Sequence, residues 1–112
     1  MKVMTTSSPF GNRTRTRVLL ALELLGESYP RELSRVLGVG LSVVQKAIRS
    51  LELDGLIAGR AVGRTRLYAI NPAYFAAKEL RQLARRLAEV DDELRQEVSG
   101  LRTRPRRSGK PL

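Results

Sequence analysis

Hydrophobic residues recur at helical spacing between residues 13 and 25 and cover two neighbouring faces of the predicted helix. Asn12 or Thr14 can cap its start, and Gly26 ends it. A helix with so wide an apolar surface is expected to make contacts on two sides. We therefore predict a central core helix here, with a subunit interface as a second interpretation of the same surface. Its apolar positions include Val18, Leu20, Leu22, Leu24 and Leu25.

Two shorter amphipathic helices follow with almost no connection between them. Pro30 suits the first position of one helix, and Gly38 marks its end. The next helix is predicted from about Leu41 to Asp54, capped either by Gly40 or by Ser42. So short a connection forces the two helices to cross steeply, as in a helix-turn-helix. The predicted inward positions are Leu33, Val36 and Leu37 in the first helix and Val44, Ile48 and Leu51 in the second.

Two short strands, residues 56–58 and 67–70, flank a glycine-containing segment and predict a hairpin. By alternation, Leu67, Ala69 and Ile57 are expected to face inward. The arginines of the segment are expected at its projecting end.

A long final helix is predicted from about Ala73 to Val98. Its apolar residues follow a heptad pattern, which is typical of a coiled-coil seam. Residues 72–100 are therefore expected to form a dimerisation helix. The predicted seam consists of Leu80, Leu83, Leu87, Val90 and Leu94. Residues 1–11 are predicted to form a flexible arm, and residues 101–112 a disordered basic tail.

Charge is distributed unevenly along the 112 residues, which carry a net +10. Residues 1–75 hold eleven basic and five acidic side chains (+6), residues 76–100 hold five and six (−1), and residues 101–112 hold five and none (+5). A positive balance favours a polyanionic partner. Residues 76–100 are nearly neutral and lie between two positive segments. We therefore expect them to mediate subunit assembly, not binding of the polyanion.

The chain contains neither cysteine nor histidine. Disulfides and metal sites that use those ligands are excluded. Asp91, Asp92 and Glu93 point in different directions on one helix, so we expect a solvated face or an ion pair there. No catalytic constellation or glycine-rich phosphate loop is present, and we expect no enzyme, no metal and no cofactor. No apolar run has the length of a membrane span or the pattern of a signal peptide, so a cytoplasmic protein without a membrane partner is expected.

The helix over residues 41–54 carries side chains suited to a DNA major groove. Gln can bind adenine through two hydrogen bonds, while Lys or Arg can bind guanine in the same way. The candidate contacts on its outer face are Ser42, Val43, Gln45, Lys46 and Arg49. Arg60, Arg64, Thr65 and Arg66 of the hairpin are candidates for the DNA backbone or minor groove. Arg31 and Arg35 are further candidates for the backbone.

Residues 12–71 resemble the winged helix-turn-helix domain of ArsR/MarR-type transcription regulators, with ArsR-like members the most similar. The resemblance rests on the segments RTRTRVLLALELLG, YPRELSRVLGV, VVQKAIRSLELDGLI and GRTRLYAINP, in that order. It implies a mainly α fold with a small β-hairpin wing (α+β), and a symmetric dimer built from the first and last helices. It also implies recognition helices in successive major grooves, with wings on the flanking backbone. The chain lacks the Cys and His ligands of the metal-sensing members.

These features together predict a homodimeric regulator that binds double-stranded DNA sequence-specifically, expected to act as a repressor at a pseudo-palindromic operator. No particular effector is indicated. Two alternatives remain open. One is a winged helix used for protein interaction, and the other is an architectural nucleoid protein with little sequence preference, for which the basic tail would be central.

Overall fold

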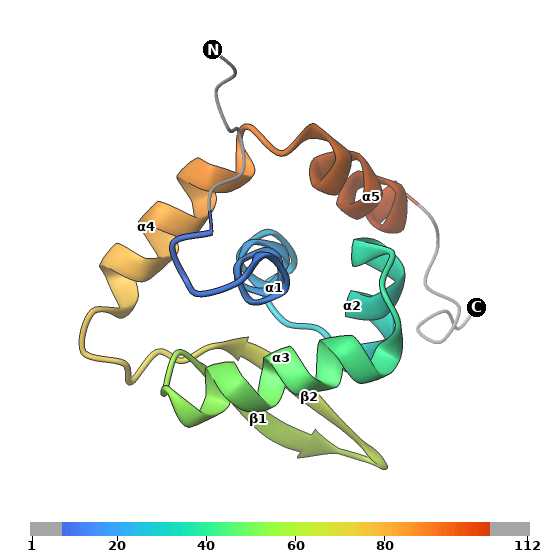
Figure 1. The fold of residues 1–112 in the computed structure, drawn as a ribbon. Coiled ribbons are helices and arrows are strands. Elements are labelled where there is room, and N and C mark those ends of the chain that lie inside the picture. The colour runs from blue at the N-terminus through green and yellow to red at the C-terminus, as the bar shows by residue number, and fades with distance from the viewer. Residues whose placement is uncertain (1–7, 104–112) are drawn as a thin grey trace.

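The computed structural model describes residues 8–103 and is mainly helical, with one two-stranded antiparallel sheet. Helix α1 lies at the centre, and the other elements surround it (Figure 1). It packs against α2, α3, α4, α5 and β2. The elements are α1 (Arg13–Leu25), α2 (Pro30–Leu37), α3 (Leu41–Leu53), β1 (Ile57–Val62), β2 (Thr65–Ile70), α4 (Ala77–Ala88) and α5 (Asp92–Thr103).

The central position of α1 explains its wide apolar surface. The five consecutive residues from Val18 to Leu22 are all at most 1% exposed. Asn12 caps the helix, because its Oδ1 accepts a hydrogen bond from the Arg15 amide at 2.8 Å. The prediction of a core helix is confirmed. The second interpretation, a subunit interface on α1, is not needed for this stretch, since the chain's own helices cover it.

Helices α2 and α3 meet through a tight turn. Gly38 adopts a left-handed conformation with φ 69°, which favours glycine, and its amide donates to the Ser34 carbonyl at 2.9 Å. Of the two possible starts of α3, the structure shows a Gly40 cap and no side-chain cap from Ser42. The inward positions predicted for both helices are buried: Leu33, Val36, Leu37, Val44, Ile48 and Leu51.

The hairpin is longer than predicted, and one of its strands faces the other way. The strands pair from Ile57 opposite Ile70 to Val62 opposite Thr65. Tyr68 and Ile70 are buried, whereas Leu67 and Ala69 are only partly buried, so the expected inward face of β2 was wrong. The reason lies outside the strand. Ser28, between α1 and α2, exchanges two backbone hydrogen bonds with Tyr68, at 2.9 and 3.0 Å, and holds β2 against the core.

The predicted continuous helix from Ala73 to Val98 is also corrected, because the structure contains two helices separated at residues 89–91. Asp91 is 9% exposed at the break. Its Oδ1 accepts from the Leu94 amide at 3.1 Å and starts α5, while Oδ2 lies 3.7 Å from Arg17 Nε on α1. This buried ion pair turns the chain back toward α1 and α2.

The break divides the predicted heptad seam. Leu80 and Leu94 are buried within the same chain, and Leu87 is partly buried. Only Leu83 and Val90 remain exposed, at 43% and 50%. The prediction of a straight coiled coil through all five seam positions is therefore wrong.

The ends of the chain also differ from expectation where they are described. Phe10, in the predicted arm, packs against the core, and its carbonyl accepts a hydrogen bond from Arg15 Nε. Residues 101–103, expected in the tail, form the end of α5. The rest of the predicted arm (1–7) and tail (104–112) lies outside the described residues. No helix between residues 8 and 103 is long and apolar enough to span a membrane.

Candidate nucleic-acid interface

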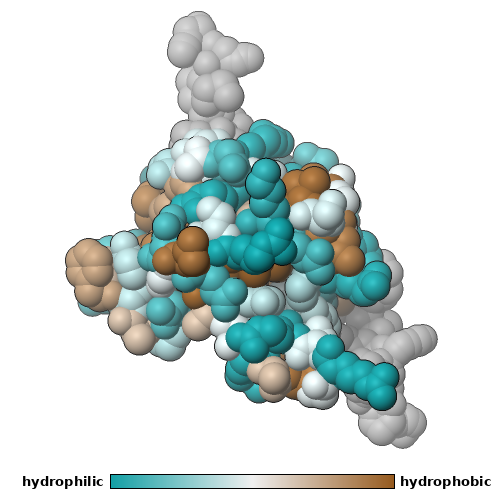
Figure 2. Space-filling model, turned by 60° about the horizontal axis from the view of Figure 1, so that its bottom comes forward, coloured by the Kyte–Doolittle hydropathy of each residue, from teal (hydrophilic) through white to brown (hydrophobic). Residues whose placement is uncertain are grey.

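The outer face of α3 carries all five side chains expected to contact DNA bases. Val44, Ala47, Ile48 and Leu51 point into the core, which leaves the opposite side of the helix to solvent. The exposed residues there are Ser42, Val43, Gln45, Lys46 and Arg49. Figure 2 views the molecule from the side of α3 and the hairpin, and hydrophilic residues cover much of this surface.

Arg15 on α1 fixes the C-terminal end of α3. Its Nη1 donates to Ser50 Oγ at 2.6 Å, and its Nη2 lies 2.9 Å from Asp54 Oδ2. The Arg15 side chain is only 14% exposed, whereas that of Asp54 is 56% exposed, so the Ser50 hydrogen bond is better shielded from water than the ion pair. Sequence reasoning missed this residue, because its partners lie 35 and 39 positions further along the chain. Arg15 is thus a positioning residue for the outer face of α3.

The four candidate residues of the hairpin fall into two groups. Arg60 is paired with Glu27 at 3.2 Å. Arg66 donates to the Gly59 carbonyl at 2.8 Å, lies 3.8 Å from Glu52 and stacks over Tyr68 at 5.7 Å. Arg64 and Thr65, by contrast, are exposed at the turn, and Arg64 makes no ion pair within residues 8–103.

A groove joins α2, α3 and the hairpin on this side of the molecule. It has a volume of about 380 Å³. Arg31, Gln45 and Thr65 all line it, so one candidate from each element is brought to the same place. Arg35 is exposed one helical turn beyond Arg31 on α2. The remaining residues of the groove wall are Tyr29, Pro30 and Leu41, which sequence reasoning did not single out.

Several basic side chains of α2, α3 and the hairpin turn have no carboxylate partner among the described residues. We call the set Arg31, Arg35, Lys46, Arg49 and Arg64 the basic face. None of these five side chains forms an ion pair within the described part of the chain. Glu27 and Glu52 are each paired with a hairpin arginine. Of the other basic side chains that the structure describes, Arg13 and Lys78 form no ion pair. The rest are paired, namely Arg15, Arg17, Arg60, Arg66, Arg81, Arg85, Arg86 and Arg95.

The acidic side chains offer no alternative centre. Asp91 is buried against Arg17, and Asp92 lies 3.9 Å from Arg95 at the surface. Glu23 is 4% exposed and binds Arg81 and Arg85, at 3.0 and 2.6 Å, which joins α1 to α4. Across residues 8–103, no group of three or more acidic side chains is arranged to hold a metal ion.

Comparisons of the chain with protein-family models, with curated proteins and with solved structures find no match. The geometry of the basic face is therefore the basis for a functional interpretation.

Proposed function

We propose that the chain is a winged helix-turn-helix regulator that binds double-stranded DNA sequence-specifically. The observation that carries this proposal is the basic face. Five cations that form no ion pair within residues 8–103 lie on α2, α3 and the hairpin turn, and the exposed side of α3 also carries Gln45. Unpaired cations on one side attract phosphates and release counterions on binding.

In this proposal, α3 enters the major groove, and its side chains contact either base edges or phosphates. Gln45 binds an adenine edge, while Lys46 and Arg49 bind guanine or phosphate. Ser42 and Val43 sit near the start of the helix, where a hydroxyl suits a phosphate and an apolar side chain suits a thymine methyl group. The groove that Gln45 shares with Thr65 places the hairpin beside α3, so Arg64 reaches the flanking backbone.

The hairpin arginines divide by their pairing. Arg64 forms no ion pair within the part of the chain that the structure describes, so it can bind a phosphate without breaking one. Arg60 and Arg66 would first exchange Glu27 and Glu52 for DNA. They therefore contribute less to DNA affinity than Arg64 does.

The functional form in this proposal is a homodimeric repressor. One α3 helix covers only a few base pairs, whereas two of them separated by about one helical turn, roughly 34 Å, read a pseudo-palindrome. Occupation of an operator by such a dimer blocks transcription. The proposal includes no cofactor.

The decisive comparison is between the full chain and a chain ending at Thr103, which keeps α5 complete. Both are titrated against an operator duplex selected from random sequence and against a random duplex. A regulator that reads bases through α3 keeps its specificity ratio when residues 104–112 are removed. Equal affinity of the full chain for both duplexes contradicts the proposal and favours an architectural protein. A chain that binds neither duplex favours a protein-interaction module.

A further inference from the structure

One aromatic side chain is far more exposed to solvent than most other large apolar side chains that the structure describes. Phe75, in the loop between β2 and α4, is 92% exposed. Its ring lies 5.0 Å from that of Tyr74 at an interplanar angle of 54°. Other exposed large apolar residues in the described part of the chain, apart from Leu53 at 88%, are 37–50% exposed. Phe75 therefore protrudes as an isolated apolar knob.

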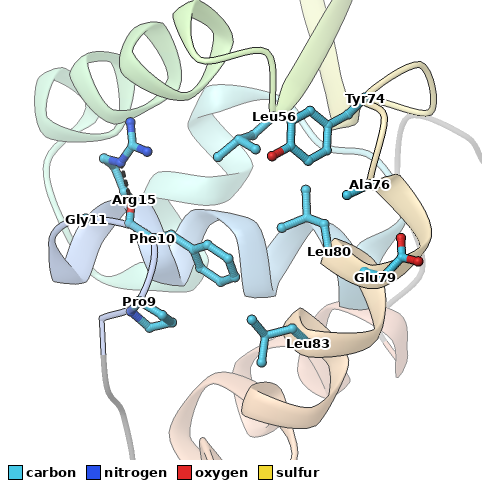
Figure 3. Close-up of a pocket in the computed structure, with 10 residues that line it drawn as sticks. All are labelled: Pro9, Phe10, Gly11, Arg15, Leu56, Tyr74, Ala76, Glu79, Leu80 and Leu83. Atoms are coloured by element: carbon cyan, nitrogen blue, oxygen red, sulfur yellow. Dashed lines mark hydrogen bonds between the residues drawn. The ribbon is translucent and has the colours of Figure 1, made fainter.

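A hollow lies directly beside this knob, between the N-terminal segment, α1 and α4. Its volume is about 500 Å³. Leu80 and Leu83 project from α4 toward Phe10, and the Tyr74 ring forms part of the upper wall (Figure 3). Tyr74 thus lines the hollow and also contacts Phe75, which places the knob and the hollow next to each other.

The charges of α4 near the hollow are left unpaired. Glu79 lines the hollow, and Lys78 precedes it in the helix. Neither forms an ion pair within residues 8–103. Two α4 helices related by a two-fold axis can bring Lys78 of one copy to Glu79 of the other. The charges beside the hollow are therefore complementary to those of a second copy.

We infer that the occupant of the hollow is Phe75 of a second copy of this chain, inserted reciprocally in a two-fold dimer. This inference rests on the homodimer of the proposed function and replaces the straight coiled coil with a specific contact. A two-fold interface requires that one surface carry both the projecting group and its receptor, as this surface does. A small molecule would fill the hollow but leave Phe75 in water, whereas a second copy buries both.

The two insertions supply only part of the area that a stable dimer buries. A buried aromatic side chain contributes about 150–250 Å². The insertion occurs twice across a two-fold axis, and the exposed Leu83 extends the apolar surface along α4. Stable interfaces bury about 1,200–2,000 Å² in total. Phe75 is therefore expected to be the central anchor of the interface, not its whole extent.

The first test is sedimentation equilibrium of the full chain without DNA. We expect a dimer whose dissociation constant rises about 30-fold or more in Phe75→Ser, the loss that truncation of an interface anchor typically causes. The matched control is Leu53→Ser, since Leu53 is equally exposed but does not line the hollow. A monomeric wild-type chain, or a Phe75→Ser chain that dimerises as tightly as wild type, overturns the inference.

The absence of native cysteine permits a second test, which detects the contact through the proximity of two introduced cysteines. Chains carrying Phe75→Cys are mixed with chains carrying Leu83→Cys and treated with a short bismaleimide. Reciprocal insertion predicts efficient cross-linking between the two kinds of chain. Leu53→Cys mixed with Leu83→Cys should cross-link little, and equal yields in the two mixtures contradict the contact.

Neither test involves DNA. Their results, taken together with the duplex titration of the proposed function, therefore separate the two proposals. A Phe75-dependent dimer without duplex preference supports this interface and overturns the proposed function. Sequence-specific binding by a dimer that is insensitive to Phe75 supports the proposed function and overturns this interface.

Discussion

Arg15 and Ser50 connect the central helix to the end of α3 through a 2.6 Å hydrogen bond between Arg15 Nη1 and Ser50 Oγ. The same guanidinium is paired with Asp54 at 2.9 Å. The helix that carries the candidate base contacts is thus anchored to the core at its C-terminal end.

Replacement of this anchor should destabilise the fold. We expect Arg15→Met to lower the free energy of unfolding by about 1–3 kcal/mol, because Ser50 and Asp54 lose a partially buried charged partner. Urea denaturation followed by circular dichroism measures the change. Arg13→Met is the matched control, since Arg13 is exposed and makes no ion pair with any described residue, and it should change stability by less than about 0.5 kcal/mol. Similar losses in the two variants would show that the Arg15 contacts contribute nothing.

Removal of Gln45 should relax the preference for one base pair. We expect Gln45→Ala to reduce discrimination at that position by about 1–3 kcal/mol, because two hydrogen bonds to a base edge are lost. Competition binding with single-base variants of a selected duplex measures this loss. Gln82→Ala, which removes an exposed glutamine from α4, should leave every position unchanged. Unaltered discrimination in Gln45→Ala would mean that this face of α3 does not read bases.

Removal of Arg64 should weaken binding to all duplexes alike. A phosphate contact carries no sequence information, and its loss lowers the dependence of log K on log salt by about one. Fluorescence anisotropy at several salt concentrations gives both quantities. The control is Arg86→Ala, since Arg86 is exposed but paired with Glu89 on α4. An unchanged salt slope for Arg64→Ala would exclude the hairpin turn from the contact.

The buried pair of Arg17 and Asp91 should matter more to stability than any surface pair. Both side chains are 9% exposed, and Arg17 Nη1 also donates to the Leu37 carbonyl at 3.2 Å. Asp91→Ala leaves a buried guanidinium without its counter-charge, a loss of about 3–5 kcal/mol. Thermal and urea unfolding measure it. Asp92→Ala, whose side chain is 84% exposed, should cost less than about 0.5 kcal/mol. If Asp91→Ala were equally mild, the pair would not hold α5 in place.

Local signals predicted α1 to α3 well, because the information lies in adjacent residues. Pro30 and Gly38 bound α2, and Val44, Ile48 and Leu51 repeat at helical spacing along the buried side of α3. Once that buried side is known, the exposed candidates on the opposite face follow from geometry.

The predictions that failed depend on partners far along the chain. Alternation within four residues cannot choose which side of β2 faces inward, and the backbone of Ser28 makes that choice by pairing with Tyr68. A heptad pattern continues across a helix break, and the break at Asp91 is held by Arg17, 74 positions earlier. Likewise, the pairing of Arg60 with Glu27 could not be read from either residue alone.

Selection of bound sites from a pool of random duplexes is the most direct test of DNA recognition by the basic face. We expect enrichment of a pseudo-palindrome whose half-sites are separated by about 10 base pairs, or one helical turn. The enrichment should be lost when Gln45 and Arg49 are both replaced by alanine. A pool that stays random after repeated rounds with the wild-type chain would contradict the proposed function.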